Sequence, residues 1–153
     1  MFRLIATAAA FGLGAAPALA QSGDPEAGAR VFNQCQTCHV VRNEAGETLA
    51  GRNARTGPNL YGIVGAPAAS QEFDYGDDLI AARERGLVWD EAALNSYLEN
   101  PGEFLQTFLE DNGARSRMQF QLRREEDRLD VIAFLATFGP APADAPAAAP
   151  ATE

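Results

Sequence analysis

Cys35-Gln36-Thr37-Cys38-His39 is the stretch that decides the fold of this 153-residue chain. Two cysteines three positions apart lie on the same side of a helical turn, so both thiols can reach one flat partner. The C-x-x-C-H pattern is typical of a c-type haem attachment site. Each thiol adds to one vinyl group of the porphyrin, and the adjacent imidazole of His39 points at the iron. The sequence therefore predicts one haem c, covalently attached through two thioether bonds to Cys35 and Cys38.

Three other interpretations of the motif compete with haem attachment. A structural disulfide is possible in an oxidising compartment, although C-x-x-C disulfides are more often redox-active and need no following histidine. A thioredoxin-like site needs alternating strands and helices, and the chain has no such alternation. A zinc site needs about four ligands, and Cys35, Cys38 and the single histidine leave it one short unless a carboxylate helps.

A sixth iron ligand is predicted at Met118. A thioether is the usual partner of histidine in electron-transferring c-type haems, and it raises the potential. Met118 is the only methionine after Met1, and it lies in the polar segment 115–120, outside the helical patterns. The alternative is a core methionine that fills a gap, but such a residue more often belongs to an apolar periodic run.

Composition limits the classes of function. The chain has 12 basic and 21 acidic residues, a net charge of −9 and a pI near 4.6. All the basic residues are arginine. This balance argues against general nucleic-acid binding, which needs a cationic surface. The hydrophobic fraction of 46% and the charged fraction of 22% are ordinary for one soluble domain.

The first twenty residues predict a secretory signal peptide. Arg3 gives a positive start, residues 4–16 are uncharged and rich in alanine, and Ala18-Leu19-Ala20 is a small-x-small cleavage site. The alternative is a retained membrane anchor, but the apolar run is shorter than the ~20 residues that a spanning helix needs. We therefore expect cleavage after Ala20, localisation in a bacterial periplasm and no membrane insertion.

The remainder predicts one folded domain at 21–138 and a disordered Ala/Pro-rich tail at 139–153. The predicted fold class is all-α, because apolar periodicity and capping residues indicate five helices. They are expected from Asp24 onward and over Asp77–Arg85, Asp90–Asn100, Glu103–Glu110 and Arg124–Phe138. The stretch 40–76 holds eight glycine and proline residues. Such a long loop could be ordered if it wrapped a group that is not protein.

These motifs occur in the order found in a known family. The chain resembles the class I cytochromes c, and most closely the bacterial cytochromes of the c2 type, over nearly all of residues 24–138. The resemblance is carried by Gly28 and Phe32, Cys35-Gln36-Thr37-Cys38-His39, Thr56-Gly57-Pro58-Asn59-Leu60, Gly86-Leu87-Val88-Trp89, Tyr97-Leu98-Glu99-Asn100-Pro101, Met118 and Val131-Ile132-Ala133-Phe134-Leu135. It implies a small cytochrome c fold of about five helices, with long loops wrapped around the haem.

The resemblance also implies roles for matching positions. Cys35 and Cys38 would hold the haem, and His39 and Met118 would be the axial ligands. The carbonyl of Pro58 would accept a hydrogen bond from the His39 ring and so orient it.

Four further positions would surround the haem. Tyr75 and Trp89 would bond a propionate, while Tyr97 and Ser116 would line the Met118 side. The alternative for the aromatic residues is plain core packing, and their polar tips allow both roles. Ala66 departs from the family pattern, because relatives often carry there an arginine that helps to neutralise a propionate.

The function that follows is a soluble, monomeric one-electron carrier and not an enzyme. By resemblance, electrons would come from a cytochrome bc1 complex and pass to a photosynthetic reaction centre or a terminal oxidase, through transient docking on these membrane complexes. One alternative is an electron-accepting module dedicated to one dehydrogenase. Another is a haem peroxidase or gas-binding protein, which needs an open iron position; Met118 argues against it.

Charge is distributed unevenly along the chain. Residues 72–111 hold eleven acids and two arginines, whereas residues 115–128 hold five arginines and three acids. Arg52 and Arg55 add two more positive charges in the long loop. We expect a dipolar molecule with a cationic docking patch near Met118 for an acidic membrane complex. The alternative is a solvated charged face without a partner.

Overall fold

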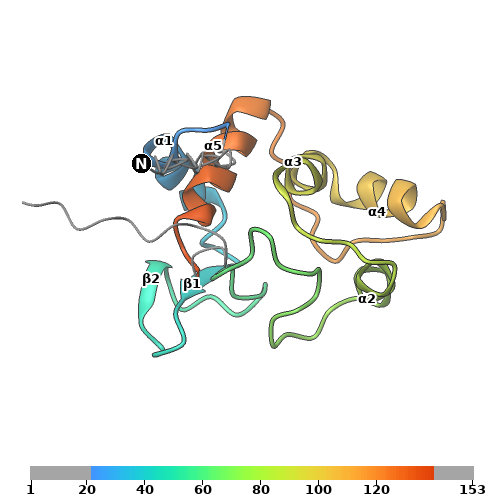
Figure 1. Ribbon diagram of the computed structural model, residues 1–153, viewed down its shortest axis with the longest axis horizontal. Coiled ribbons are helices and arrows are strands. Elements are labelled where there is room, and N and C mark those ends of the chain that lie inside the picture. Colours follow the sequence, from blue (N-terminus) through green and yellow to red (C-terminus); the bar gives the residue numbers. More distant parts are fainter. Residues whose placement is uncertain (1–21, 140–153) are drawn as a thin grey trace, which may run out of the picture.

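The computed structural model describes residues 22–139, and these form five α-helices, one 3-10 turn and one small hairpin (Figure 1). The elements are α1 (Pro25–Val31), η1 (Phe32–Gln34), β1 (Val40–Arg42), β2 (Thr48–Gly51), α2 (Asp77–Glu84), α3 (Glu91–Glu99), α4 (Pro101–Leu109) and α5 (Glu125–Ala136). The predicted all-α class with about five helices is confirmed. The predicted signal peptide at 1–20 and the predicted tail, apart from Gly139, lie outside the described residues.

The first and last helices pack closely against each other, and this contact closes the domain (Figure 1). Asp24 caps α1 by accepting a hydrogen bond from the Glu26 N–H at 2.8 Å, as its position before Pro25 predicts. Gly28 makes the contact possible, since a Cβ added there would lie 2.0 Å from the Asp130 carbonyl oxygen. Phe32 and Phe134 extend the interface, with ring centroids 5.4 Å apart.

Helices α3 and α4 follow each other with one residue between them. Asn100 ends α3, and its side chain caps α4 by accepting from the Glu103 N–H at 3.3 Å. The predicted start of α4 at Glu103 is wrong by two residues. Pro101 begins this helix, because proline suits the first turn, where its missing N–H leaves no bond unmade. The helix ends at Leu109, one residue before the predicted Glu110, and Glu110 takes the left-handed conformation that stops it.

The long loop is ordered and contains a short antiparallel hairpin that the sequence did not predict. Strand β1 pairs with β2, and the turn between them closes through three hydrogen bonds between Asn43 and Glu47. Leu60 N–H then donates to the Val40 carbonyl at 2.8 Å, which lays the segment after Arg55 beside the strand that follows the C-x-x-C-H motif. Figure 1 shows this loop running from the hairpin toward α2.

The core is apolar, and only two polar side chains of the described residues are fully buried in it. These are Ser116, which is 7% exposed, and Arg128, which is 4% exposed. Ser116 lies in the segment between α4 and α5, which also holds Met118, and Arg128 lies in the first turn of α5. Among residues 22–139, no helix has the length and apolar character needed to cross a membrane.

Candidate functional site

The C-x-x-C-H motif folds into the tight turn that its spacing predicts. The N–H groups of Cys38 and His39 both donate to the Cys35 carbonyl, at 3.0 and 2.9 Å. Both thiols are free, with Cys35 half-buried and Cys38 exposed. Burial, reinforced by the neighbouring Cys38 thiol, raises the pKa of Cys35 to about 11. The described residues form five helices and one two-stranded hairpin, and so lack the alternating strands and helices that the thioredoxin-like alternative needs.

The loop that contains Pro58 orients the His39 ring. Its Nδ1 lies 2.9 Å from the Pro58 carbonyl oxygen, as predicted. A carbonyl only accepts, so Nδ1 carries the proton and Nε2 keeps the lone pair that a metal needs. Burial lowers the pKa of His39, and the hydrogen bond to Pro58 only partly offsets this effect. The lowered pKa keeps the imidazole neutral at pH 7.

Gly57 shapes the cradle behind this ring, a role that the sequence did not assign. A Cβ at Gly57 would lie 2.5 Å from His39 Cε1 and under 3.0 Å from both ring nitrogens. The Gly57 N–H also donates to the Cys38 carbonyl at 2.8 Å. The backbone therefore passes directly across the imidazole, and any side chain at this position would displace it.

Asn59 fixes this cradle to β1. Its amide oxygen accepts from the Arg42 N–H at 2.9 Å, and its amide nitrogen donates to the Arg42 carbonyl at 2.7 Å. The side chain thus satisfies both backbone groups of one strand residue. The one signal for this role in the sequence is indirect, namely the position of asparagine directly after Gly57-Pro58.

Met118 is half-buried against the core, in a segment held by α3. The hydroxyl groups of Tyr97 and Ser116 lie 2.9 Å apart in the interior, and the Met118 N–H donates to Ser116 Oγ at 3.2 Å. Burial raises the pKa of Tyr97, so its hydroxyl stays protonated. The predicted neighbourhood of Tyr97, Ser116 and Met118 is thus present.

The two aromatic residues predicted to bond a propionate, Trp89 and Tyr75, have different ring neighbours. Trp89 is 4% exposed and packs on Tyr97, with ring centroids 4.8 Å apart. Tyr75 is half-buried and packs edge-on against Phe73 at 5.3 Å, and its burial raises its pKa. Within residues 22–139, no ring contact joins Tyr75 to Trp89. Their shared role at a propionate stays a prediction.

The chemistry of these donors fits a haem c. Two free thiols in one turn suit thioether attachment, while a neutral imidazole with one free nitrogen and a half-buried thioether suit iron. The zinc alternative lacks a ligand set in the described part of the chain, where no three His, Cys, Asp or Glu side chains come together.

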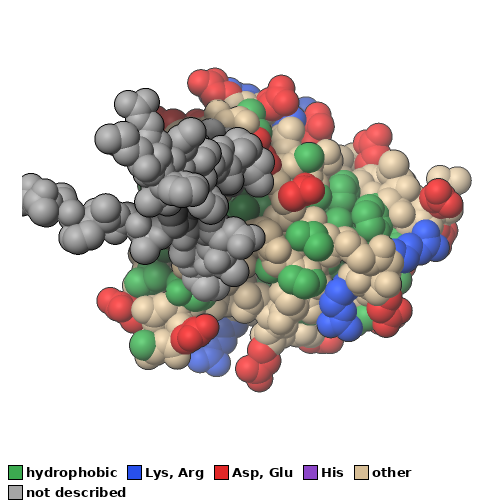
Figure 2. Space-filling model, in the orientation of Figure 1, with side chains coloured by type: hydrophobic (Ala, Val, Ile, Leu, Met, Phe, Trp, Pro, Cys, Tyr) green, Lys and Arg blue, Asp and Glu red, His purple; other side chains and the backbone are tan. Residues whose placement is uncertain are grey.

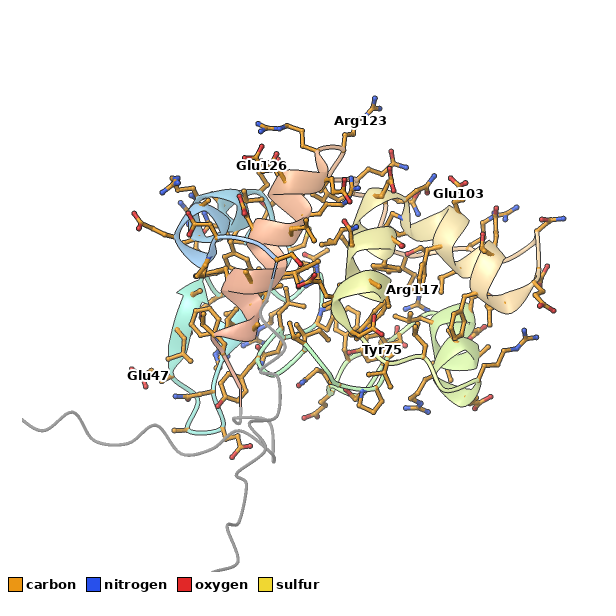
Figure 3. All side chains as sticks on the ribbon, turned by 45° about the horizontal axis from the view of Figure 1, so that its top comes forward. Glu47, Tyr75, Glu103, Arg117, Arg123 and Glu126 are labelled. Carbon is orange, nitrogen blue, oxygen red and sulfur yellow. The ribbon has the colours of Figure 1, made fainter. Side chains whose placement is uncertain are left out.

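The predicted cationic patch near Met118 is weaker than the sequence count implies. Arg117 Nη1 lies 2.9 Å from Asp74 Oδ2, and Arg124 Nη2 lies 2.6 Å from Glu126. Arg128 adds no positive charge to the surface patch, because its side chain is buried. Figure 3 shows Arg117 near Tyr75, while Arg123 projects from the far end of the segment. Acidic side chains also lie around the rim of the face drawn in Figure 2.

Comparison with known proteins gives close and nearly full-length matches. No family model matches the chain. It is 48% identical over 136 residues to a cytochrome c2 of Cereibacter sphaeroides, covering 88% of this chain and 94% of that protein. It is 44% identical over 137 residues to a cytochrome c-551 of Roseobacter denitrificans, covering 90% and 96%. It is also 40% identical over 140 residues to a cytochrome c-550 of Paracoccus denitrificans, covering 90% and 88%.

Solved structures agree with these relatives. The crystal structure of cytochrome c2 from Rhodobacter sphaeroides matches with a TM-score of 0.76 at 46% identity, covering 79% of this chain and all of that one. Ferric cytochrome c-550 from Paracoccus versutus matches with a TM-score of 0.73 at 38% identity, covering 78% of this chain and all of that one.

Proposed function

Because this chain belongs to the class I c-type cytochromes close to cytochrome c2, we propose that it is a periplasmic electron shuttle with His39 and Met118 as its iron ligands. It is an electron carrier and holds one covalently attached haem c, the group that supplies one-electron redox chemistry. Cys35 and Cys38 are its only cysteines, so they form the two thioether bonds.

The observation that carries the proposed ligation is the orientation of His39. Its ring is fixed by the 2.9 Å contact from Nδ1 to the Pro58 carbonyl and by the Gly57 backbone, which leaves Nε2 as the one available donor. Met118 is the only methionine besides Met1, and its segment is tied to α3 through Ser116 and Tyr97. Two ligands held this firmly need little movement when an electron arrives or leaves.

Met118→Ala tests the ligand assignment. We expect the ferric variant to lose the absorption band that arises from charge transfer between the methionine sulfur and iron, because Met118 is the only methionine after Met1. The reduction potential should also fall, since the thioether favours ferrous iron. Absorbance and potentiometric titration measure both effects. Gln121→Ala, an exposed change in the same segment, serves as the control. An unchanged thioether band in Met118→Ala would refute the assignment.

The proposed partners are a cytochrome bc1 complex as donor and a reaction centre or terminal oxidase as acceptor. Docking is transient and uses the exposed arginines of residues 115–124 against an acidic surface. Arg117 is central to this surface, because it lies one residue before Met118 and its side chain is 59% exposed. Asp74, which is 93% exposed, reduces the field that Arg117 presents.

The Arg117–Asp74 pair tests the docking surface, because changing one residue should slow electron transfer and changing the other should speed it. We expect Arg117→Glu to slow electron transfer to an acidic partner roughly threefold to tenfold at low salt, and Asp74→Asn to speed it, because both changes act on the same local field. Both effects should shrink toward 150 mM salt, where the screening length is about 8 Å. Stopped-flow second-order rate constants measure them.

Arg30→Glu on α1 is the matched control, because this exposed arginine also has an acidic neighbour, Glu26 at 3.8 Å, but belongs to the first helix. If Arg30→Glu slows transfer as much as Arg117→Glu, net charge and not a local docking surface controls the rate.

A further inference from the structure

Arg128 is the one buried cation of the described residues, and its surroundings explain how it is tolerated there. Its side chain is 4% exposed. A buried charge is costly unless it is paired and its hydrogen-bond donors are satisfied. The Nε–H group donates to Asn95 Oδ1 at 2.6 Å, and Nη1 donates to the carbonyls of Leu122 and Arg123 at 3.0 and 2.9 Å. Nη2 lies 3.6 Å from a Glu99 carboxylate oxygen.

These bonds join three parts of the chain. Arg128 itself lies on α5, Asn95 and Glu99 lie on α3, and the two carbonyls belong to the segment that runs from Met118 to α5. The Leu122 N–H adds a further bond to this junction by donating to the Leu98 carbonyl of α3 at 2.8 Å. The guanidinium thus fixes the segment four to five residues after Met118.

The other side of Met118 is tied to the same helix. Ser116, two residues earlier, bonds Tyr97 of α3 and accepts from the Met118 N–H. Both flanks of the methionine are therefore held on α3, one by a hydroxyl pair and one by a guanidinium. The C-terminal flank depends on arginine in particular, because a planar fork with five donors can serve two carbonyls and an amide at once.

We propose that Arg128 is a positioning residue for Met118. By fixing the C-terminal flank of the segment, it limits how readily the thioether leaves the iron. This proposal rests on the proposed ligation by Met118. It predicts that loss of Arg128 opens the sixth position to outside ligands more than an equal loss of global stability caused elsewhere in the fold does.

Imidazole binding to the ferric holoprotein measures this opening, because imidazole can enter only when the thioether has left. We expect Arg128→Ala to raise the apparent affinity for imidazole about tenfold, because the apparent affinity rises in proportion to the fraction of molecules whose sixth position is open. Arg128→Lys should raise it less, since lysine keeps the charge but cannot serve all three acceptors. Absorbance titration of the holoprotein gives each affinity, and denaturant unfolding gives the stability of each variant.

Phe134→Ala is the control for global destabilisation. It removes a ring that packs on Phe32 between α1 and α5, so we expect lower stability with imidazole affinity within about twofold of the wild type. The proposal is overturned if Arg128→Ala leaves the affinity within about twofold, or if Phe134→Ala raises it equally. If Arg128→Ala does not fold, Asn95→Ala decides: an affinity raised severalfold supports the proposal, and an unchanged one overturns it.

Met118→Ala in the same titration separates this proposal from the ligand assignment. If Met118→Ala does not raise imidazole affinity, the ligation by Met118 fails. If it does raise the affinity and the Arg128 variants do not, only the positioning role fails.

Discussion

Replacing Gly28 with alanine is expected to destabilise the folded protein by about 3 kcal/mol or more, because the added methyl group has no room. A Cβ at this position would lie 2.0 Å from the Asp130 carbonyl oxygen and 2.7 Å from Phe134 Cβ. The first contact is with the backbone of α5, which cannot rotate away as a flexible side chain can. The helices α1 and α5 would therefore have to separate, which also exposes Phe32. Denaturant unfolding of the holoprotein measures the loss, with a fall in Tm of about 10 °C or more.

Gly102→Ala is the matched control, since it makes the same substitution at another helical glycine. At Gly102 the nearest atom to an added Cβ is Asn100 Oδ1, at an ordinary contact distance of 3.7 Å. We expect this variant to be neutral or more stable by up to about 1 kcal/mol, because alanine loses less backbone freedom on folding. Equal effects of the two variants would contradict the close helix packing at Gly28.

Replacing both Cys35 and Cys38 with alanine is expected to abolish covalent haem attachment. The chain has no other cysteine, so no thiol would be left to form a thioether bond. The haem content that survives denaturing extraction should fall from one per chain to none, as read by intact mass. Each single variant keeps one thiol and should retain at most one thioether bond.

Thr37→Ala, which changes the exposed residue between the cysteines and leaves both thiols, is the control for the double variant. It should keep its haem through the same extraction. Covalent haem in the double variant would show that another residue forms the attachment.

The parts of the fold that the sequence predicted are those determined locally. Asp24 caps α1 as its position before Pro25 indicated, and α3 lies within the predicted range Asp90–Asn100. The C-x-x-C-H turn likewise depends on neighbours in the chain, because its hydrogen bonds run between residues three and four apart. The hairpin of β1 and β2 was missed, because strands of three and four residues are too short to show an alternating pattern.

The neighbours of the proposed ligands His39 and Met118 were predicted better than the residues that hold their segments in place. His39, Pro58, Met118, Tyr97 and Ser116 followed from motifs and from resemblance, and the structure places His39 on Pro58, and Met118 with Tyr97 and Ser116. The role of Arg128 was missed, because its partners lie 5 to 33 residues away in the sequence.

The charge count overstated the positive charge near Met118 for the same reason. Arg117 and Asp74 are 43 residues apart in the chain, and only the fold reveals that they form a pair. The sequence pattern did not identify Arg128 as an interior residue either. Arg128 follows three consecutive acidic residues, and such a charged stretch is typical of a solvent-exposed surface.

The most direct test of the account is one sample of the wild-type protein, purified after secretion from a bacterial host and measured by intact mass and by its absorption spectrum in both redox states. We expect the mass of residues 21–153 plus one haem, with six-coordinate, low-spin iron whether ferric or ferrous. A colourless protein with the mass of its polypeptide alone, or five-coordinate high-spin iron, would contradict it.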